Sequence, residues 1–416
     1  MVRANTVFAI FLIIIGLTTN VYIVSHVFSP DGKISSNLLR VVIWIWDISC
    51  MSCGVVLLKY RHLISLRTIK PSYLIYLGIS TTIALCVAEA ALRILGYGSW
   101  HDGRLGTTEI RVDGEKHYSV VDSVLGHTII PGLITITMPT GLRFSATHCH
   151  NRSRATHLPS EEMDQPEIWT LGCSFTYGWG VDDSGSYPWK LKKRLPGYEV
   201  VNFGVSGYGT LQTLMWFQRN MKTLDPPLVA ILGYVPWHDE RNVLARSWKK
   251  NLAAYEELAF MEHPFGFLDD DGHLCVARAT IHYTGLPLIQ YSAFMNLLDD
   301  FVNKIDLKRR SGIELTAAIL DSFSISARRA GTVPVIAFMM DDPISRKLFM
   351  HCGEYGIRSI DISVDLGSPE NTLLPLDPHP SAHAHRQYAD KLYEFLIEEK
   401  LIDPQAEPSV MIHPIK

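Results

Sequence analysis

Residues 167–178 read EIWTLGCSFTYG, a short apolar run that ends at a glycine and passes directly into a turn carrying Cys173 and Ser174. Four more runs of the same kind follow: YEVVNFG (198–204), PLVAILGY (227–234), VPVIAF (333–338) and IRSIDI (357–362). Amphipathic stretches separate them. Short buried strands that alternate with helices are typical of a parallel sheet covered on both faces. The sequence therefore predicts an α/β domain.

The predicted domain spans residues 166–403, ahead of a C-terminal tail at 404–416. Its helices are expected at 187–195, 211–224, 313–329, 344–353 and 381–399. An insertion at about 243–312 contains FLDDDGHL (267–274), whose Asp-Gly pair is typical of a β-hairpin turn. Residues 96–165 are predicted to form a connector, in which ITITMPTGLRF (134–144) indicates a strand and a turn.

The composition excludes two classes of protein. Of the 416 residues, 47% are hydrophobic and only 19% are charged, so a large core can form and intrinsic disorder is excluded. The formal net charge is −4, with 38 basic and 42 acidic residues. A nucleic-acid-binding protein needs a dense cationic surface. Nucleic acid is therefore not expected as a partner.

Apolar residues are concentrated in the first 95 positions. They predict three membrane-spanning helices, at 7–27, 39–58 and 73–95, because a span takes roughly 20 apolar residues. We prefer a retained helix to a signal peptide for the first, which lacks a small-residue cleavage site. The basic loop KYRHLISLRTIK (59–70) is expected on the cytoplasmic side. The expectation is an integral protein of the plasma (inner) membrane with an extracytoplasmic, periplasmic C-terminal domain.

Polar residues follow the predicted strands, where the active sites of open α/β sheets lie. Ser174 follows the first strand, Gly207 lies in NFGVSGYG (202–209) after the second, and WHDERN (237–242) follows the third. A serine is a weak nucleophile unless a base activates it and an acid orients that base. His379 and Asp377, in DPHPS before the last helix, supply both groups. Taken alone, Ser174 could also be an ordinary turn residue and His379 a helix cap.

These segments together resemble the SGNH (GDSL-like) hydrolase family over roughly residues 165–400. LGCSFTYG (171–178) is similar to the first block, GDSFTxG, which implies Ser174 as the nucleophile. NFGVSGYG is similar to the second block, which places Gly207 with the Ser174 N–H in the oxyanion hole. GYVPWHDERN (233–242) stands where the third block, GxND, is expected, and DPHPSAHAH (377–385) resembles the fifth, which implies Asp377 and His379 as the rest of the triad.

The resemblance implies a three-layer α/β/α, flavodoxin-like domain. The order of helical spans, then VLGHTIIPG (124–132), then the domain resembles membrane-anchored members of the family. Three departures stand out: Cys173 replaces the Asp of the first block, His238 replaces the third-block Asn, and the Asp–His spacing is the shorter of the family's forms. His238 is kept as a third oxyanion donor, with a structural role as the alternative. The side chain of Cys173 is expected to point away from Ser174.

Several residues beside these motifs have two readings. Trp179, Tyr208 and Trp237 are candidates to stack on sugar rings, or they belong to the core. Arg241 either binds an anionic substrate group or pairs with Asp239 or Glu240. His383 and His385 fall on the final helix. They are expected at the surface or in packing and not as metal ligands, because the spacing of the sequence brings no third ligand to them. No metal and no cofactor are expected.

The sequence thus predicts a membrane-anchored serine esterase that acts on ester-linked acyl groups of a cell-surface glycan or lipid. Two alternatives stay open. In the first, the chain is an O-acyltransferase component of envelope polysaccharide modification, with a membrane acyltransferase as partner. In the second, it is a catalytically silent glycan-binding module. The N-terminal spans are either a plain anchor in the lipid bilayer or an interaction surface.

Overall fold

The computed structural model describes residues 4–28, 37–60, 71–100, 109–113, 119–158, 165–253, 261–310 and 312–406. The chain divides into two compact units. Unit 1 comprises residues 1–102, 245–255 and 282–309, and unit 2 comprises residues 103–244, 256–281 and 310–416. The candidate catalytic residues all belong to unit 2.

Unit 2 is built on a five-stranded parallel sheet in the order β12-β11-β8-β6-β7. The strands are β6 (Glu167–Gly172), β7 (Glu199–Gly204), β8 (Val229–Tyr234), β11 (Val333–Phe338) and β12 (Ser359–Asp361). Numbered along the chain this is the order 2-1-3-4-5, the flavodoxin-like arrangement. All five predicted strands are confirmed, and so are the parallel sheet and the α/β class.

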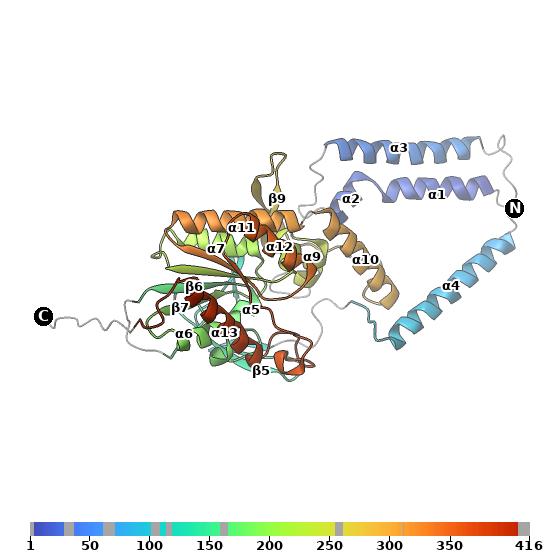
Figure 1. The fold of residues 1–416 in the computed structure, drawn as a ribbon. Helices are drawn as coiled ribbons and strands as arrows, with labels where there is room; N and C mark the ends of the chain where they lie inside the picture. The colour runs from blue at the N-terminus through green and yellow to red at the C-terminus, as the bar shows by residue number, and fades with distance from the viewer. Residues whose placement is uncertain are drawn as a thin grey trace. The chain divides into compact units, whose positions relative to one another are not determined.

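Helices cover both faces of this sheet (Figure 1). On one face lie α6 (Tyr187–Arg194) and α13 (Ala382–Glu398), and on the other α7 (Thr210–Asn220), α11 (Gly312–Arg329) and α12 (Pro343–Glu354). Each of these helices overlaps a predicted one, with bounds that differ by at most four residues. The three-layer architecture follows from strands that are apolar on both sides, such as β8, which is buried at every position.

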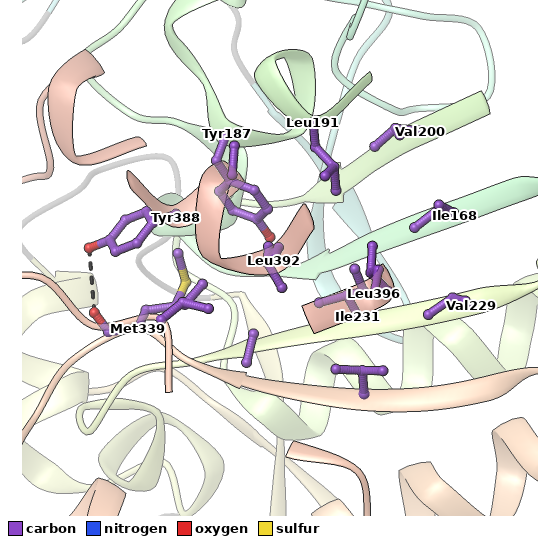
Figure 2. Packing of buried hydrophobic residues seen from close by; sticks show 14 of the residues in the cluster. Ile168, Tyr187, Leu191, Val200, Val229, Ile231, Met339, Tyr388, Leu392 and Leu396 are labelled. Atoms are coloured by element: carbon purple, nitrogen blue, oxygen red, sulfur yellow. Dashed lines mark hydrogen bonds between the residues drawn. The ribbon is translucent and has the colours of Figure 1, made fainter. Parts of the chain in front are cut away.

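The face covered by α6 and α13 holds a continuous hydrophobic core (Figure 2). Ile168, Val200 and Ile231 project from the strands toward Leu191 of α6 and Leu392 of α13. All five are fully buried, and each such side chain contributes roughly 1.5–3 kcal/mol through the hydrophobic effect. This core fixes α13 against the sheet, and with it the loop that precedes α13.

The opposite face is held by aromatic side chains. Trp169 of β6 makes edge-to-face contacts with Phe203 of β7 and with Trp216 and Phe217 of α7. Phe217 in turn contacts Phe323 of α11 at a centroid distance of 5.2 Å. Pairs of this kind add about 0.5–1.5 kcal/mol beyond the area that they bury. The two layers of helices therefore hold the central strands firmly from both sides.

The described residues of the segment before β6 form five short strands. β1 (Glu109–Val112), β4 (Gly132–Thr137) and β5 (Arg143–His148) form an antiparallel sheet, and β2 (Ser119–Asp122) pairs with β3 (Gly126–Ile129). The strand and turn predicted over 134–144 are confirmed by β4 and β5. A bridge between Arg154 and Asn202 joins this segment to the edge of β7.

The insertion after β8 contributes to both units. Its hairpin, β9 (Glu262–Leu268) and β10 (Leu274–Thr280), turns at the predicted Asp-Gly pair and belongs to unit 2. Its helices α9 (Arg246–Ala253) and α10 (Ala293–Arg309) belong to unit 1. Buried ion pairs join these two helices: Asp299 accepts from Arg246 at 2.6 Å and from Lys250 at 3.0 Å.

The remaining helices of unit 1 are α1 (Ala4–Thr18), α2 (Val21–Phe28), α3 (Asn37–Lys59) and α4 (Pro71–Ile94). The segments predicted as spans are thus helical. However, within the part of the chain that the structure describes, no helix combines the length and the apolar character needed to cross a membrane. The predicted membrane spans at 7–27, 39–58 and 73–95 are therefore not supported, and the prediction is corrected on this point.

The described parts of these helices contain a break and several ionisable side chains. The first segment breaks at Thr19 and Asn20 into helices of 15 and 8 residues, of which the longer rises only about 22 Å. The Asn20 side chain accepts from the Ile23 N–H at 3.0 Å and so starts the second helix. α3 contains Asp47, and α4 contains the Glu89–Arg93 ion pair. Residues 61–70 of the basic loop lie outside the described residues.

Candidate active site

The turn after β6 places Ser174 at the start of a short helix, α5 (Ser174–Tyr177). Gly172 has a φ of +153°, and a Cβ built on it would lie 2.5 Å from the Thr176 hydroxyl oxygen and 3.0 Å from the Gly233 carbonyl oxygen. Only glycine fits this conformation and this space. Gly178, with a φ of +88°, ends the helix. These two glycines therefore make a one-turn helix with the serine at its first position.

The structure brings together the three residues that the sequence proposed as a triad. His379 Nε2 lies 2.8 Å from Ser174 Oγ, and His379 Nδ1 lies 2.5 Å from Asp377 Oδ1. The His379 backbone N–H also donates to Asp377 Oδ1, at 2.8 Å. Serine and aspartate are almost completely buried, while the histidine side chain is 22% exposed. A base between a hydroxyl and a carboxylate in this geometry can remove the serine proton.

The carboxyl group of Asp377 stays ionised although it is buried. Burial raises its pKa, but the hydrogen bonds and charge of His379 outweigh that effect and hold the pKa below its usual value, with a smaller contribution from Trp179. Because a carboxylate accepts the Nδ1 proton, the lone pair of the neutral ring lies on Nε2, which faces Ser174. Asp377 therefore selects the tautomer that a general base needs.

The loop that carries His379 and Asp377 is held at both ends. The Leu373 N–H donates to the His379 carbonyl oxygen at 3.0 Å, and the Asp377 N–H donates to the Leu373 carbonyl oxygen at 3.3 Å. Ser381 then caps α13, its hydroxyl oxygen accepting from the N–H of His383 and of Ala384. The loop is thus fixed to the helix that the hydrophobic core holds against the sheet.

Gly207, the predicted oxyanion residue, lies in the turn after β7. Its φ is +87°, a conformation that favours glycine. The end of β7 packs closely on the serine helix, because a Cβ on Gly204 would clash with the backbone nitrogen of Tyr177. Within the described residues, the N–H groups of Ser174 and Gly207 donate no hydrogen bond. Both are therefore free to bind an anion.

His238 begins the short helix α8 (His238–Asn242) after β8. It is completely buried, its Nδ1 lies 3.1 Å from the Thr210 hydroxyl, and its Nε2 has no partner among the described residues. Burial, and to a lesser degree the positive charge of Arg241, lowers the pKa of His238 well below its usual value. The ring is therefore neutral and presents one unpaired nitrogen.

The aromatic candidates fall into two groups. Trp179 lies with its ring centroid 6.2 Å from that of His379, and Trp237 contacts Phe175, which itself lies 5.6 Å from His379. Both tryptophans are partly exposed. Tyr208, by contrast, is 1% exposed, so its ring has no face open to a substrate.

Arg241 belongs with Tyr208 rather than with the aromatic residues around His379. Its guanidinium donates to the Tyr208 carbonyl oxygen at 2.8 Å, which supports the turn that carries Gly207. The histidines of the last helix are placed as expected: His385 is buried and accepts from the Tyr187 N–H at 3.3 Å, and His383 is exposed. Cys173 is buried in the hydrophobic core, as expected of a side chain that points away from Ser174.

Sequence reasoning missed three residues that support the serine helix. Arg154 is buried, and its guanidinium donates to the carbonyl oxygens of Tyr177 and Gly178 at 2.9 and 2.6 Å. Asn202 donates to the same Tyr177 oxygen at 3.2 Å, and His148 Nε2 lies 2.9 Å from the Tyr177 hydroxyl. Arg154 and His148 come from the segment before β6, where no periodic pattern marked them. Both lie in the polar stretch RFSATHCHNRSRATH (143–157), which holds further arginines and histidines, so residue type did not single them out either.

Among the described residues, one group has three metal-ligating side chains close together: Asp269, Asp271 and His273. It lies on the exposed turn of the β9–β10 hairpin. All three side chains face solvent, and such acidic turns are common without an ion. We assign no metal to it.

No protein-family model and no curated protein matches the chain. Two solved structures with weak likeness are a member of the lipolytic protein G-D-S-L family from Veillonella parvula and a family two carbohydrate esterase from Clostridium thermocellum. The first is 14% identical, covers 56% of this chain and 98% of its own, and has a TM-score of 0.34. The second is 10% identical, covers 59% and 68%, and has a TM-score of 0.31. At such identities and TM-scores neither neighbour tells what this chain does.

Proposed function

We propose that this protein is a serine hydrolase that cleaves esters through an acyl-enzyme. The observation that carries the proposal is the continuous hydrogen-bonded series Ser174–His379–Asp377, with distances of 2.8 and 2.5 Å. It lies beyond the carboxyl ends of the strands, where Ser174 follows β6 and β8 is the neighbour at which the strand order reverses. Ligand sites of open α/β sheets lie at this switch point.

In the proposed reaction Ser174 Oγ attacks the ester carbonyl carbon while His379 Nε2 takes the hydroxyl proton. Asp377 stabilises the imidazolium that forms. The tetrahedral intermediate collapses as His379 returns the proton to the leaving alcohol, which gives an acyl-serine and the free alcohol. Water then attacks the acyl-serine with His379 again as base, releasing the acid and restoring the serine hydroxyl.

The N–H groups of Ser174 and Gly207 are the proposed donors to the oxyanion. Both are free in the structure, and backbone donors of this kind lower the barrier by several kcal/mol in acyl transfer. His238 is the proposed third donor. When the Thr210 hydroxyl donates to Nδ1, the ring proton lies on Nε2, which is the nitrogen without a partner.

The test is labelling of the full-length protein with a fluorophosphonate, beside Ser174→Ala and His379→Ala. We expect the wild type to be labelled, the serine variant not at all, and the histidine variant at least about 10³-fold more slowly, because its serine lacks a base. A well-folded wild-type protein that takes no label would refute the mechanism, and a binding module would then be the better reading.

We further propose an acylated glycan as the substrate. The partly exposed rings of Trp179 and Trp237 lie around His379, and flat aromatic faces suit the apolar faces of sugar rings. Trp179→Ala should then raise KM for an acetylated oligosaccharide several-fold more than KM for p-nitrophenyl acetate. Equal effects on the two esters would argue against sugar stacking. Adding a glycan acceptor and analysing the products separates hydrolysis from acyl transfer.

A further inference from the structure

The turn that carries Gly207 is a type II β-turn. The Tyr208 N–H donates to the Val205 carbonyl oxygen at 3.2 Å, Gly207 has a φ of +87°, and Ser206 is not among the residues with a positive φ. A type II turn has a positive φ only at its third residue. Types I and II differ mainly in the orientation of the central peptide, which here joins Ser206 to Gly207. This turn therefore has two alternatives for the direction of the Gly207 N–H.

One side chain contacts that central peptide directly. His127 Nε2 lies 2.9 Å from the Ser206 carbonyl oxygen. Because a carbonyl only accepts, Nε2 carries the ring proton. Burial lowers the pKa of His127 although the bond to Ser206 opposes this, so the ring is neutral and its other nitrogen is unprotonated. Nδ1 indeed has no partner in the described part of the chain.

The bond from His127 determines where the Gly207 N–H points. The peptide between Ser206 and Gly207 is planar and trans, so its C=O and its N–H point in opposite directions. With the C=O directed at His127, the N–H is directed away from it. In the other orientation of the peptide the N–H would point toward His127, and the Ser206 C=O would take the side that the N–H now occupies.

We infer that His127 is a positioning residue, which holds the Ser206–Gly207 peptide in the orientation that offers the Gly207 N–H to the oxyanion. This inference rests on the proposed function. His127 is well placed for the task because it is fixed in turn: its own carbonyl oxygen accepts from the Tyr208 hydroxyl at 2.7 Å. Arg241 holds the Tyr208 carbonyl oxygen from a third direction. β3, in the segment before the catalytic sheet, thus contributes to the reaction without touching the substrate.

Three full-length variants test the inference. His127→Phe keeps a ring and removes the donor, whereas His127→Gln keeps an N–H at a similar reach. His263→Phe is the matched control. His263 is also 2% exposed, and its ring centroid lies 5.6 Å from that of His127, but it makes no hydrogen bond to the turn in the described part of the chain. The probes are p-nitrophenyl acetate and its thiono analogue, whose sulfur accepts hydrogen bonds weakly.

We expect His127→Phe to lower kcat for the oxo-ester by about 10²-fold, the typical effect of losing one oxyanion donor, with KM nearly unchanged. The kcat for the thiono-ester should fall much less, so the ratio of the oxo-ester rate to the thiono-ester rate should decrease. His127→Gln should restore most of the oxo-ester rate, and His263→Phe should keep the wild-type ratio. Equal losses for both esters, or a His127→Gln variant as slow as His127→Phe, would overturn the inference.

A crystal structure of His127→Phe tests the inference without any activity. We expect the turn to change to type I, with a negative φ at Gly207. A turn that remains type II would overturn the positioning role whatever the rates are. If instead the wild type shows no Ser174-dependent hydrolysis, the proposed function fails, while the turn type of the variant still decides whether His127 orients the peptide.

Discussion

At the scale of single residues, the charge on Asp377 matters more than its contacts. Asp377→Asn leaves an oxygen that can accept from His379, but it removes the negative charge that stabilises the imidazolium and fixes the tautomer. We expect the rate of fluorophosphonate labelling to fall by about 10³–10⁴-fold with little change in the thermal midpoint. A rate within tenfold of the wild type would mean that Asp377 does not orient the base.

Asp239, next to His238, is expected to make the stability of the protein depend on pH. Burial raises the pKa of its carboxyl group to about 7 despite hydrogen bonds from Thr316 and Tyr234. The folded protein therefore holds this proton up to a higher pH than the unfolded chain, whose carboxyl titrates near 3.8. Stability is greatest below the unfolded pKa and is lost as the pH rises toward 7.

Urea unfolding of the wild type and of Asp239→Asn, from pH 4 to pH 8, measures this effect. The free energy of unfolding of the wild type should fall relative to the variant by on the order of 3 kcal/mol between pH 4 and 7, and then level off. A difference that does not change with pH would show that the Asp239 carboxyl is ionised throughout.

At the scale of elements, the one-turn helix α5 that carries Ser174 is too short to be stable alone, and contacts from Arg154 stabilise it. The buried guanidinium pairs with the partly buried Asp183 at 2.8 Å and binds the carbonyl oxygens at the end of α5. Arg154→Met removes the buried charged donor that Asp183 and these carbonyl oxygens share, so we expect a loss of about 3–5 kcal/mol in the free energy of unfolding. Labelling of Ser174 should slow in conditions where the variant is still folded.

Arg194→Met is the control for this prediction. Its partner Asp390 lies 2.6 Å away, but the two side chains are 42% and 35% exposed. A solvent-exposed pair contributes at most about 1 kcal/mol. If the two arginine variants lose the same stability, burial is not what makes Arg154 important.

At the scale of the whole molecule, the N-terminal helices and the insertion helices α9 and α10 form one compact unit, although Glu89 and Ala293 are 204 residues apart in the chain. Glu89 of α4 accepts from the N–H groups of Ala293 and Phe294 at 2.9 and 3.0 Å and from the Ser292 hydroxyl at 2.8 Å, and so caps α10. These bonds lower the pKa of Glu89 to about 2. The cap is therefore complete above the unfolded pKa near 4.5 and is lost only as the pH falls through about 2.

Glu89→Ala should thus expose α10 to faster amide hydrogen exchange at pH 7 while β6, β7 and β8 keep their protection. Mass spectrometry on peptides from α10 and from the central strands measures both at once. Glu109→Ala, which removes an exposed ion pair with Arg111, is the control and should change neither. Faster exchange throughout unit 2 would contradict this division of the molecule.

Local patterns in the sequence were enough to locate the elements of the parallel sheet and the candidate residues Ser174, His379 and Asp377. Each strand carries an apolar run, the turns after β6 and β7 carry glycines, Ser174 follows a strand end, and Asp377 and His379 precede the last helix. These features are local, and the parallel sheet brings them together. Helices were also predicted for the N-terminal region. However, the runs of apolar residues there did not indicate the break at Asn20 or the capping of α10 by Glu89.

The residues that hold the candidate site in place became visible only in the folded structure. Arg154 and His127 lie in a segment without a periodic pattern, and they act through hydrogen bonds to backbone oxygens far away in the chain. Tyr208 is buried, and its hydroxyl donates to the His127 carbonyl oxygen, a contact that no property of the tyrosine itself predicts. Contacts of this kind depend on which distant surfaces the folded chain brings together, whereas hydrophobic periodicity reports only on neighbours along the chain.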